Sequence, residues 1–115
     1  MKYLKINFEA LDGYYNLVIN NDHTYLVETS IACLDNKNGI IDNYDSFIEK
    51  LNNVNIKSWD KEYIGDIEDG VKWMVEIDGF SSIGSEGNWP YTYDKLIDAL
   101  RLIDEKIDYF RANLD

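Results

Sequence analysis

The stretch VKWMVEIDGF, residues 71–80, constrains the fold more than any other part of the sequence. It alternates apolar side chains with mostly charged ones, as a half-buried strand does. Asp78-Gly79 follows, and this dipeptide favours the tight turn of a β-hairpin. We therefore expect an antiparallel hairpin with residues 80–85 as its second strand. The side chains expected on the buried face of the first strand are Val71, Trp73, Val75 and Ile77.

Three more alternating stretches open the chain and predict an antiparallel meander. Short turns rich in Asn, Asp and Gly separate them. DNKNG, residues 35–39, is expected to be the turn that ends the meander. The buried faces are expected to hold Leu4, Ile6 and Phe8 in residues 2–9, Tyr15, Leu17 and Ile19 in residues 14–20, and Tyr25, Val27 and Ile31 in residues 24–34.

Two segments have the period of a helix instead. In residues 42–54, apolar side chains recur at spacings of three and four, and Asp42 is expected to be the N-cap. Residues 92–115 predict one long amphipathic helix with Thr92 as its N-cap. Its buried stripe is expected to hold Leu96, Ile97, Leu100, Ile103, Ile107, Phe110 and Leu114.

Together these elements predict a single α+β domain over residues 1–115. An antiparallel sheet of about five strands with two helices on one face is the natural way to bury these apolar faces, in the order βββ-α-ββ-α. Residues 55–70 have no clean period, and we expect a loop there with room for a short strand.

The balance of charge is strongly acidic, because 22 Asp and Glu against 11 Lys and Arg give a net charge of −11. Such a chain repels anions, so direct binding to nucleic acid or to an anionic membrane is not expected. The charge favours a basic protein as partner, and the chain itself is expected to be a monomer or a weak dimer. The amino terminus lacks the apolar run of a signal peptide, and no segment approaches about 18 apolar residues, so we expect a cytoplasmic location.

Motifs for catalysis, metal binding or cofactor binding do not stand out, so no catalytic residue, metal ligand or cofactor is predicted. His23 lies in an expected turn, and nothing marks a nucleophile beside it. Cys33 is the only cysteine, cannot form an intramolecular disulfide, and is expected to be a small buried apolar residue. The glycines at 79, 84 and 87 do not form a phosphate-binding loop.

The acids gather in two places, and these form our candidate partner-binding surface. Residues 60–69, which we call the acidic loop, hold five acids opposed only by Lys61, with aromatic residues beside them. Aromatic side chains surrounded by charged side chains are typical of protein interfaces. A solvated charged surface without a partner is the alternative. The residues predicted to bind a partner are Trp59, Asp60, Glu62, Tyr63, Asp66, Glu68 and Asp69 at the loop, Glu86 in a later turn, and Asp94, Asp98, Glu105 and Asp108 on the last helix.

The stretch GSEGNWPYTYDKL, residues 84–96, is expected to join the hairpin to the last helix. Gly84 and Gly87 allow backbone angles that other residues resist. Pro90 ends the strand and keeps the residue before it extended. Trp89 is therefore expected to pack beneath the helix.

Three segments, WDKEY, DGVKWMVEI and GSEGNWPYTYDKL, resemble a family of small, mostly uncharacterised, immunity-protein-like proteins of low-GC bacteria. The shared pattern is a Trp-x3-Tyr, an Asp-Gly-x2-Trp that opens a strand, a Gly/Asn-rich turn, an aromatic-Pro pair and a closing helix, over about residues 56–103. Some of these proteins look like immunity proteins encoded beside toxins. The resemblance therefore implies a binding role and assigns no catalytic residue. It is carried by Trp59, Tyr63, Asp69, Gly70, Trp73, Gly84, Asn88, Trp89 and Pro90.

The sequence thus predicts a non-enzymatic acidic inhibitor of the immunity type, which binds and blocks a basic toxin, with a nuclease as the expected target. One alternative is a phage or mobile-element anti-defence protein of the anti-CRISPR kind that imitates nucleic acid. A second alternative is a small ligand-binding or enzymatic module. A third is a structural protein that pairs through the edge of its sheet.

Overall fold

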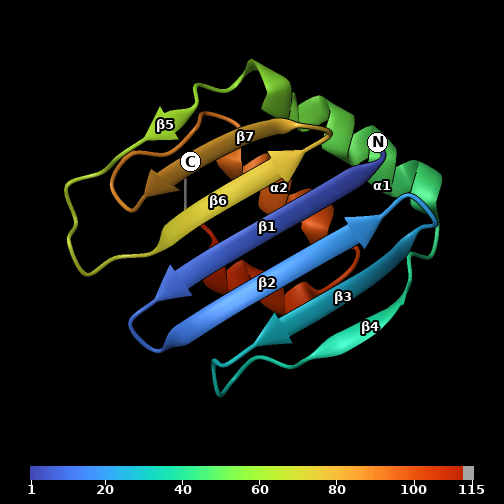
Figure 1. The fold of residues 1–115 in the computed structure, drawn as a ribbon, viewed down its shortest axis with the longest axis horizontal. Coiled ribbons are helices and arrows are strands. Elements are labelled where there is room, and N and C mark those ends of the chain that lie inside the picture. Colours follow the sequence, from blue (N-terminus) through green and yellow to red (C-terminus); the bar gives the residue numbers. More distant parts are fainter. Residues whose placement is uncertain (113–115) are drawn as a thin grey trace.

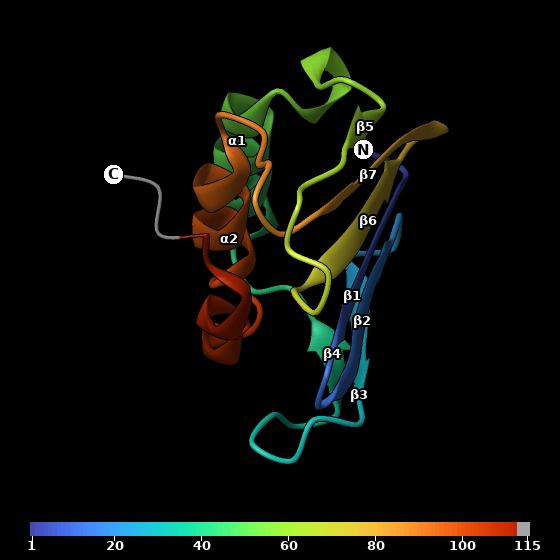
Figure 2. The same ribbon diagram turned by 90° about the vertical axis from the view of Figure 1, so that its left-hand side faces the viewer.

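All of the strands lie in one sheet, and the helices pack on one face of it (Figure 1, Figure 2). This computed structural model describes residues 1–112, and the order of strands in the sheet is β4-β3-β2-β1-β6-β7-β5. The strands are β1 (Tyr3–Ala10), β2 (Gly13–Asn20), β3 (Thr24–Thr29), β4 (Lys37–Ile40), β5 (Glu62–Tyr63), β6 (Lys72–Ile77) and β7 (Phe80–Ser85). The helices are α1 (Tyr44–Val54), α2 (Tyr93–Leu100) and two 3-10 helices, η1 (Ile56–Ser58) and η2 (Glu105–Phe110).

The alternation predicted for the first two strands and for the hairpin is confirmed. β1 lies between β2 and β6 and pairs antiparallel with both. Ile6 faces Leu17 on one side and Val75 on the other, and all three are buried. Since side chains alternate along a strand, every second residue lies under the helices, and the others lie on the opposite, uncovered face (Figure 2).

The predicted hairpin of β6 and β7 turns at Asp78 and Gly79, whose φ angles are 46° and 88°. Two successive positive φ angles are what a type I′ turn requires. The Asp78 carboxylate also accepts hydrogen bonds from the backbone N–H groups of Lys2 and Tyr3, at 2.7 and 2.9 Å. The turn residue therefore also fixes the start of β1.

The prediction of an antiparallel sheet of about five strands in the order βββ-α-ββ-α is wrong. Within residues 1–112, seven strands form a mixed sheet, because β4 and β5 add an edge on either side and β5 runs parallel to β7. β4 forms where a turn was expected, and its Asn38 and Gly39 have low strand propensity. Pairing with the outer edge of β3 overrides that propensity. β3 itself ends at Thr29, short of residue 34, and the Asn36 side chain accepts the Thr29 N–H at 2.7 Å.

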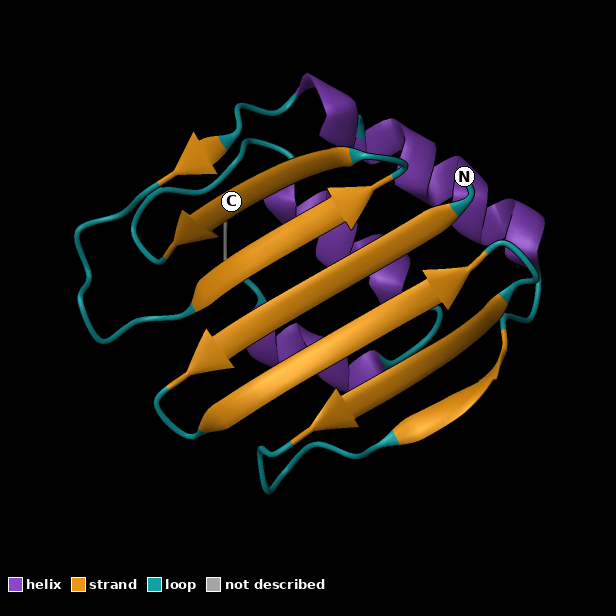
Figure 3. Ribbon diagram, in the orientation of Figure 1, coloured by secondary structure: helices purple, strands orange, loops and turns teal. Residues whose placement is uncertain are grey.

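The prediction of one long helix over residues 92–115 is also wrong. α2 ends at Leu100, and the chain turns through Asp104 into η2, which packs beside α2 (Figure 3). A straight helix of roughly 24 residues would measure about 36 Å, whereas strands of about eight residues span about 27 Å, so the turn keeps the apolar stripe above the sheet. Leu114, which was predicted for that stripe, lies outside the described residues.

Of the two predicted N-caps, Asp42 is wrong and Thr92 is confirmed in position. The N-cap of α1 is Asn43, not Asp42, and its side chain accepts the backbone N–H three residues on at 3.4 Å. Thr92 does occupy the N-cap position of α2, but its hydroxyl makes no capping bond. It donates to the Val54 carbonyl oxygen and accepts from the Trp59 indole N–H, both at 2.8 Å. Thr92 therefore joins α1, α2 and the start of the acidic loop.

The core lies between the sheet and the helical layer. The rings of Phe8 on β1 and Phe110 on η2 stack with centroids 4.1 Å apart. Beside them, the Tyr15 hydroxyl donates to Asp104 Oδ2 at 2.7 Å, and both residues are buried. These two contacts fix η2 to the sheet. Among residues 1–112, no helix is long and apolar enough to cross a membrane.

Candidate protein-binding surface

The acidic loop contains β5 and runs along the outer side of β7 (Figure 1). The Ile83 N–H donates to the Lys61 carbonyl at 2.9 Å, and the Gly65 N–H donates to Ser85 Oγ at 2.7 Å. At Gly65 the two backbones approach so closely that an added Cβ would lie 2.0 Å from the Glu86 carbonyl oxygen. Hydrogen bonds and close packing therefore hold the loop against the sheet.

The two aromatic residues predicted as partner-binding anchors, Trp59 and Tyr63, turn inward. Trp59 is only 7% exposed, and its indole N–H is bonded to Thr92. Tyr63 is half-buried, with its ring centroid 6.1 Å from that of Trp73. The Tyr63 hydroxyl accepts the Asp60 backbone N–H at 2.8 Å. Both aromatic side chains therefore fasten the acidic loop to its own protein, and Trp59 is a core residue.

Isoleucines take the exposed positions instead. Ile64 is 59% exposed and Ile67 is 46% exposed, although both lie among acids within the loop. Ile83 on β7 pairs with Glu62 on β5 and is 42% exposed on the uncovered face of the sheet. The sequence prediction missed Ile64 and Ile67 because the loop has no period from which to infer exposure. The sequence signal that could have revealed their exposure is the presence of apolar residues within a run of acids.

The five acids of the loop remain exposed. No ion pair within residues 1–112 neutralises any of their carboxylates. Unpaired carboxylates that lie close together raise the local negative potential and attract a cationic surface. The acids that the structure leaves exposed and without an ion pair along this loop are Asp60, Glu62, Asp66, Glu68 and Asp69.

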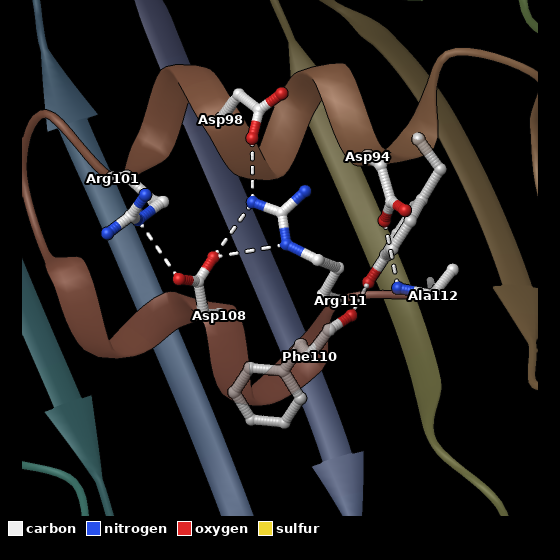
Figure 4. Close-up of polar contacts among 8 residues, drawn as sticks. Asp94, Asp98, Arg101, Asp108, Phe110, Arg111 and Ala112 are labelled. Atoms are coloured by element: carbon white, nitrogen blue, oxygen red, sulfur yellow. Dashed lines mark hydrogen bonds and ion pairs between the residues drawn. The ribbon is translucent and has the colours of Figure 1, made fainter. Parts of the chain in front are cut away.

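Two of the acids predicted on the last helix are engaged within the protein (Figure 4). The Arg111 guanidinium lies 2.6 Å from Asp98 and 2.8 Å from Asp108. Arg101 adds a second contact to Asp108, at 3.0 Å. Hydrogen bonds to Asp108 and Asp98 raise the pKa of Arg111. This network joins α2 to η2 and reduces the charge that Asp98 and Asp108 present to a partner.

Three further acids were predicted to bind a partner, and the structure places two of them on α2 and η2 and one beside the acidic loop. The Asp94 carboxylate on α2 accepts the Ala112 backbone N–H at 2.8 Å. Glu105 is exposed on η2. Glu86 is half-buried, accepts the Val71 N–H at 3.1 Å, and packs against the acidic loop. Of these three acids, the structure thus brings Glu86 alone to the loop.

His23 and Cys33 are the single histidine and the single cysteine of the sequence. The His23 ring stacks on Tyr44 with centroids 3.5 Å apart. Cys33 is exposed, which corrects the expectation that it is buried, because the segment after β3 leaves it on the surface. In the part of the chain that the structure describes, no group of three or more His, Cys, Asp or Glu side chains is placed to hold a metal ion.

Comparison with known proteins adds no family to this picture, since the sequence matches no protein-family model and no curated protein. The geometry of the acidic loop is therefore the basis for a functional proposal.

Proposed function

We propose that this chain is a non-enzymatic, immunity-type inhibitor that binds and blocks a basic toxin in the cytoplasm, with a nuclease as the expected class of target. The observation that carries the proposal is that Ile64 and Ile67 are exposed among five carboxylates. No Lys or Arg side chain within residues 1–112 forms an ion pair with any of these carboxylates. The resemblance of residues 56–103 to immunity-like proteins points the same way.

This combination of charged and apolar side chains is typical of a protein interface. The charge attracts the partner, and the apolar area stabilises the complex. The carboxylates speed the approach of a cationic surface and select against acidic partners. The exposed isoleucines supply apolar area that loses water on contact. A central apolar patch within a polar rim is the usual anatomy of a protein interface.

The first half of the loop also has little conformational freedom to lose on binding. Hydrogen bonds to β7 at Lys61 and Gly65 and the inward packing of Trp59 hold this part of the backbone in place before any partner arrives. Ordering a mobile loop weakens binding, so a pre-formed surface retains more of its interaction free energy. The arrangement supports a binding role, since it presents a surface of fixed shape and charge.

The first experiment is to capture the partner with the tagged chain from lysate of its native host and to identify it by mass spectrometry. The purified partner is then titrated with the wild type and with an Ile64→Ser, Ile67→Ser double variant. We expect a one-to-one complex with a basic protein, weakened about 10- to 100-fold by the double variant.

The matched control replaces two exposed apolar residues away from the acidic loop, Ile40 and Leu102, by Ser. It should change the affinity by less than about threefold, since surface contacts outside an interface contribute little. Equal effects of the two double variants would place the interface elsewhere. Identification of a defence nuclease in place of a toxin would favour the anti-defence alternative.

A further inference from the structure

A cleft of about 380 Å³ opens beside the acidic loop, between the turn that follows β7 and the end of η2. Its volume falls within the range of ligand-binding clefts, about 300–1,000 Å³. The lining combines apolar, aromatic and acidic side chains, which suits a ligand that is flat and charged. The side chains on which the inference depends are Ile67, Val71, Glu86, Trp89, Tyr109 and Arg111.

Glu86 places a carboxylate at this cleft. Its Oε1 accepts the Val71 N–H at 3.1 Å, and no residue among 1–112 donates to its other oxygen. Its side chain packs against Gly70, where an added Cβ would lie 2.5 Å from the Glu86 Cβ. The carboxylate is therefore held by one oxygen, and the other oxygen remains able to accept a hydrogen bond from a ligand.

The charges around the cleft favour a cation. Arg111 is the one cationic side chain on the described lining, and Asp98 and Asp108 hold its guanidinium at 2.6 and 2.8 Å (Figure 4). On the loop side, Asp66 does not line the cleft, but its Oδ1 lies 2.9 Å from the position that a Cβ on the lining residue Gly87 would occupy. An arriving cation would thus meet the carboxylate of Glu86, with that of Asp66 close to the rim, while the charge of Arg111 is already balanced.

Two aromatic side chains make the cleft better suited to a guanidinium than to an ammonium group. Trp89 is half-buried, with its ring centroid 4.4 Å from that of Tyr93. The Tyr109 hydroxyl donates a hydrogen bond to Asp12, and its ring meets Phe110 edge-on at 5.0 Å. These contacts fix both rings. A guanidinium is planar and weakly hydrated, so it stacks on aromatic rings while it bonds a carboxylate.

We propose that this cleft receives the guanidinium group of an arginine side chain, with Glu86 as its hydrogen-bonded counter-ion and Trp89 as its stacking surface. The inference rests on the proposed function, because the arginine is supplied by the basic partner. It goes further by naming the contact: one arginine enters the cleft while the carboxylates and isoleucines of the acidic loop contact the surface around it.

The test uses the protein alone and a small probe, Nα-acetyl-L-arginine amide, followed by NMR of the ¹⁵N-labelled chain. We expect saturable shifts of the Trp89 indole signal with a dissociation constant on the order of millimolar, as befits so small a ligand. The citrulline counterpart has nearly the same shape without the charge and should cause no saturable shift. Equal binding of the two probes would overturn the proposal.

A pair of variants locates the counter-ion. Glu86→Gln keeps an oxygen to accept the Val71 N–H but removes the charge, and it should weaken arginine binding about tenfold. Glu68→Gln removes one charge from the exposed acidic loop outside the cleft, and its effect should stay below about twofold. Equal losses in the two variants would also overturn the proposal. Since no partner protein is involved, the cleft can fail this test while the proposed inhibitor function stands, and the reverse also holds.

Discussion

Replacement of Tyr15 by Phe tests the polar contact that fixes η2 to the sheet. The Tyr15 hydroxyl donates to Asp104 at 2.7 Å, and the two residues are 0% and 5% exposed. Without that hydroxyl, the buried Asp104 carboxylate keeps the Lys106 N–H as its one hydrogen-bond donor among the described residues. An incompletely satisfied buried group costs about 1–3 kcal/mol, so the free energy of unfolding should fall by about that amount. For a domain of this size the Tm should fall by about 4–12 °C.

Urea denaturation followed by tryptophan fluorescence and by circular dichroism measures this change. The matched control is Tyr14→Phe, the neighbouring residue on the uncovered face, which is 43% exposed. Its effect should stay within about 0.5 kcal/mol. A Tyr15→Phe variant as stable as Tyr14→Phe would refute the reasoning. A double-mutant cycle with Asp104→Asn should show a coupling of at least about 1 kcal/mol.

Three further predictions concern pH, the acidic loop and the α2–η2 network. Burial, reinforced by its hydrogen bond, raises the pKa of Tyr15 above the ordinary value of 10.0, and burial does the same for Tyr93. The unfolded chain therefore loses these protons first. The free energy of unfolding should fall above about pH 10 by up to about 1.4 kcal/mol per pH unit per tyrosine, less steeply in Tyr15→Phe, as urea titrations at several pH values will show. Gly65→Ala puts a Cβ 2.0 Å from a backbone oxygen, so it should cost about 1–3 kcal/mol and speed amide exchange in β5. Arg111→Gln removes partly exposed ion pairs, so calorimetry should show a loss of no more than about 1 kcal/mol.

Strands with one buried face could be predicted from the sequence, whereas of the two edge strands β4 was missed and β5 was expected only as a possible short strand within residues 55–70. The alternation of Trp73, Val75 and Ile77 matches the burial of these residues, because burial on one face imposes a period of two on the sequence. β4 and β5 carry no such constraint. Each exists because the neighbouring strand offers unpaired backbone groups, and this depends on tertiary structure that the local pattern does not contain.

The position of the acidic loop was predictable, whereas its anchors were not. Its charge is a property of composition, and exposure of the acids follows from the cost of burying them. Trp59 and Tyr63 suit a core as well as an interface, and only the packing against Thr92 and Trp73 decides between the two. Because those two rings point inward, other side chains of the loop, such as Ile64, occupy its exposed surface.

The ion pairs of the second acidic group could not be predicted for a different reason. A continuous helix would have kept Asp98 and Asp108 together on a solvated face. The turn at Asp104 folds η2 back along α2 and places Arg111 between the two carboxylates. The apolar stripe does not reveal this turn, because the spacing of its residues suits a helix on either side of it.

The affinity of the captured basic partner for two charge-reversal variants tests the docking surface most directly. One variant replaces the three acids of residues 66–69 by Lys. The other is a control with the same change of charge at exposed acids elsewhere, Glu28, Asp42 and Glu49. The affinity is measured by calorimetric titration at about 50 and 300 mM salt. The first variant should bind the partner at least about tenfold more weakly than the wild type, with the largest loss at low salt, and the affinity of the control should stay within about threefold of the wild type. Equal losses in the two variants would mean that net charge alone attracts the partner, and would contradict an interface at the acidic loop.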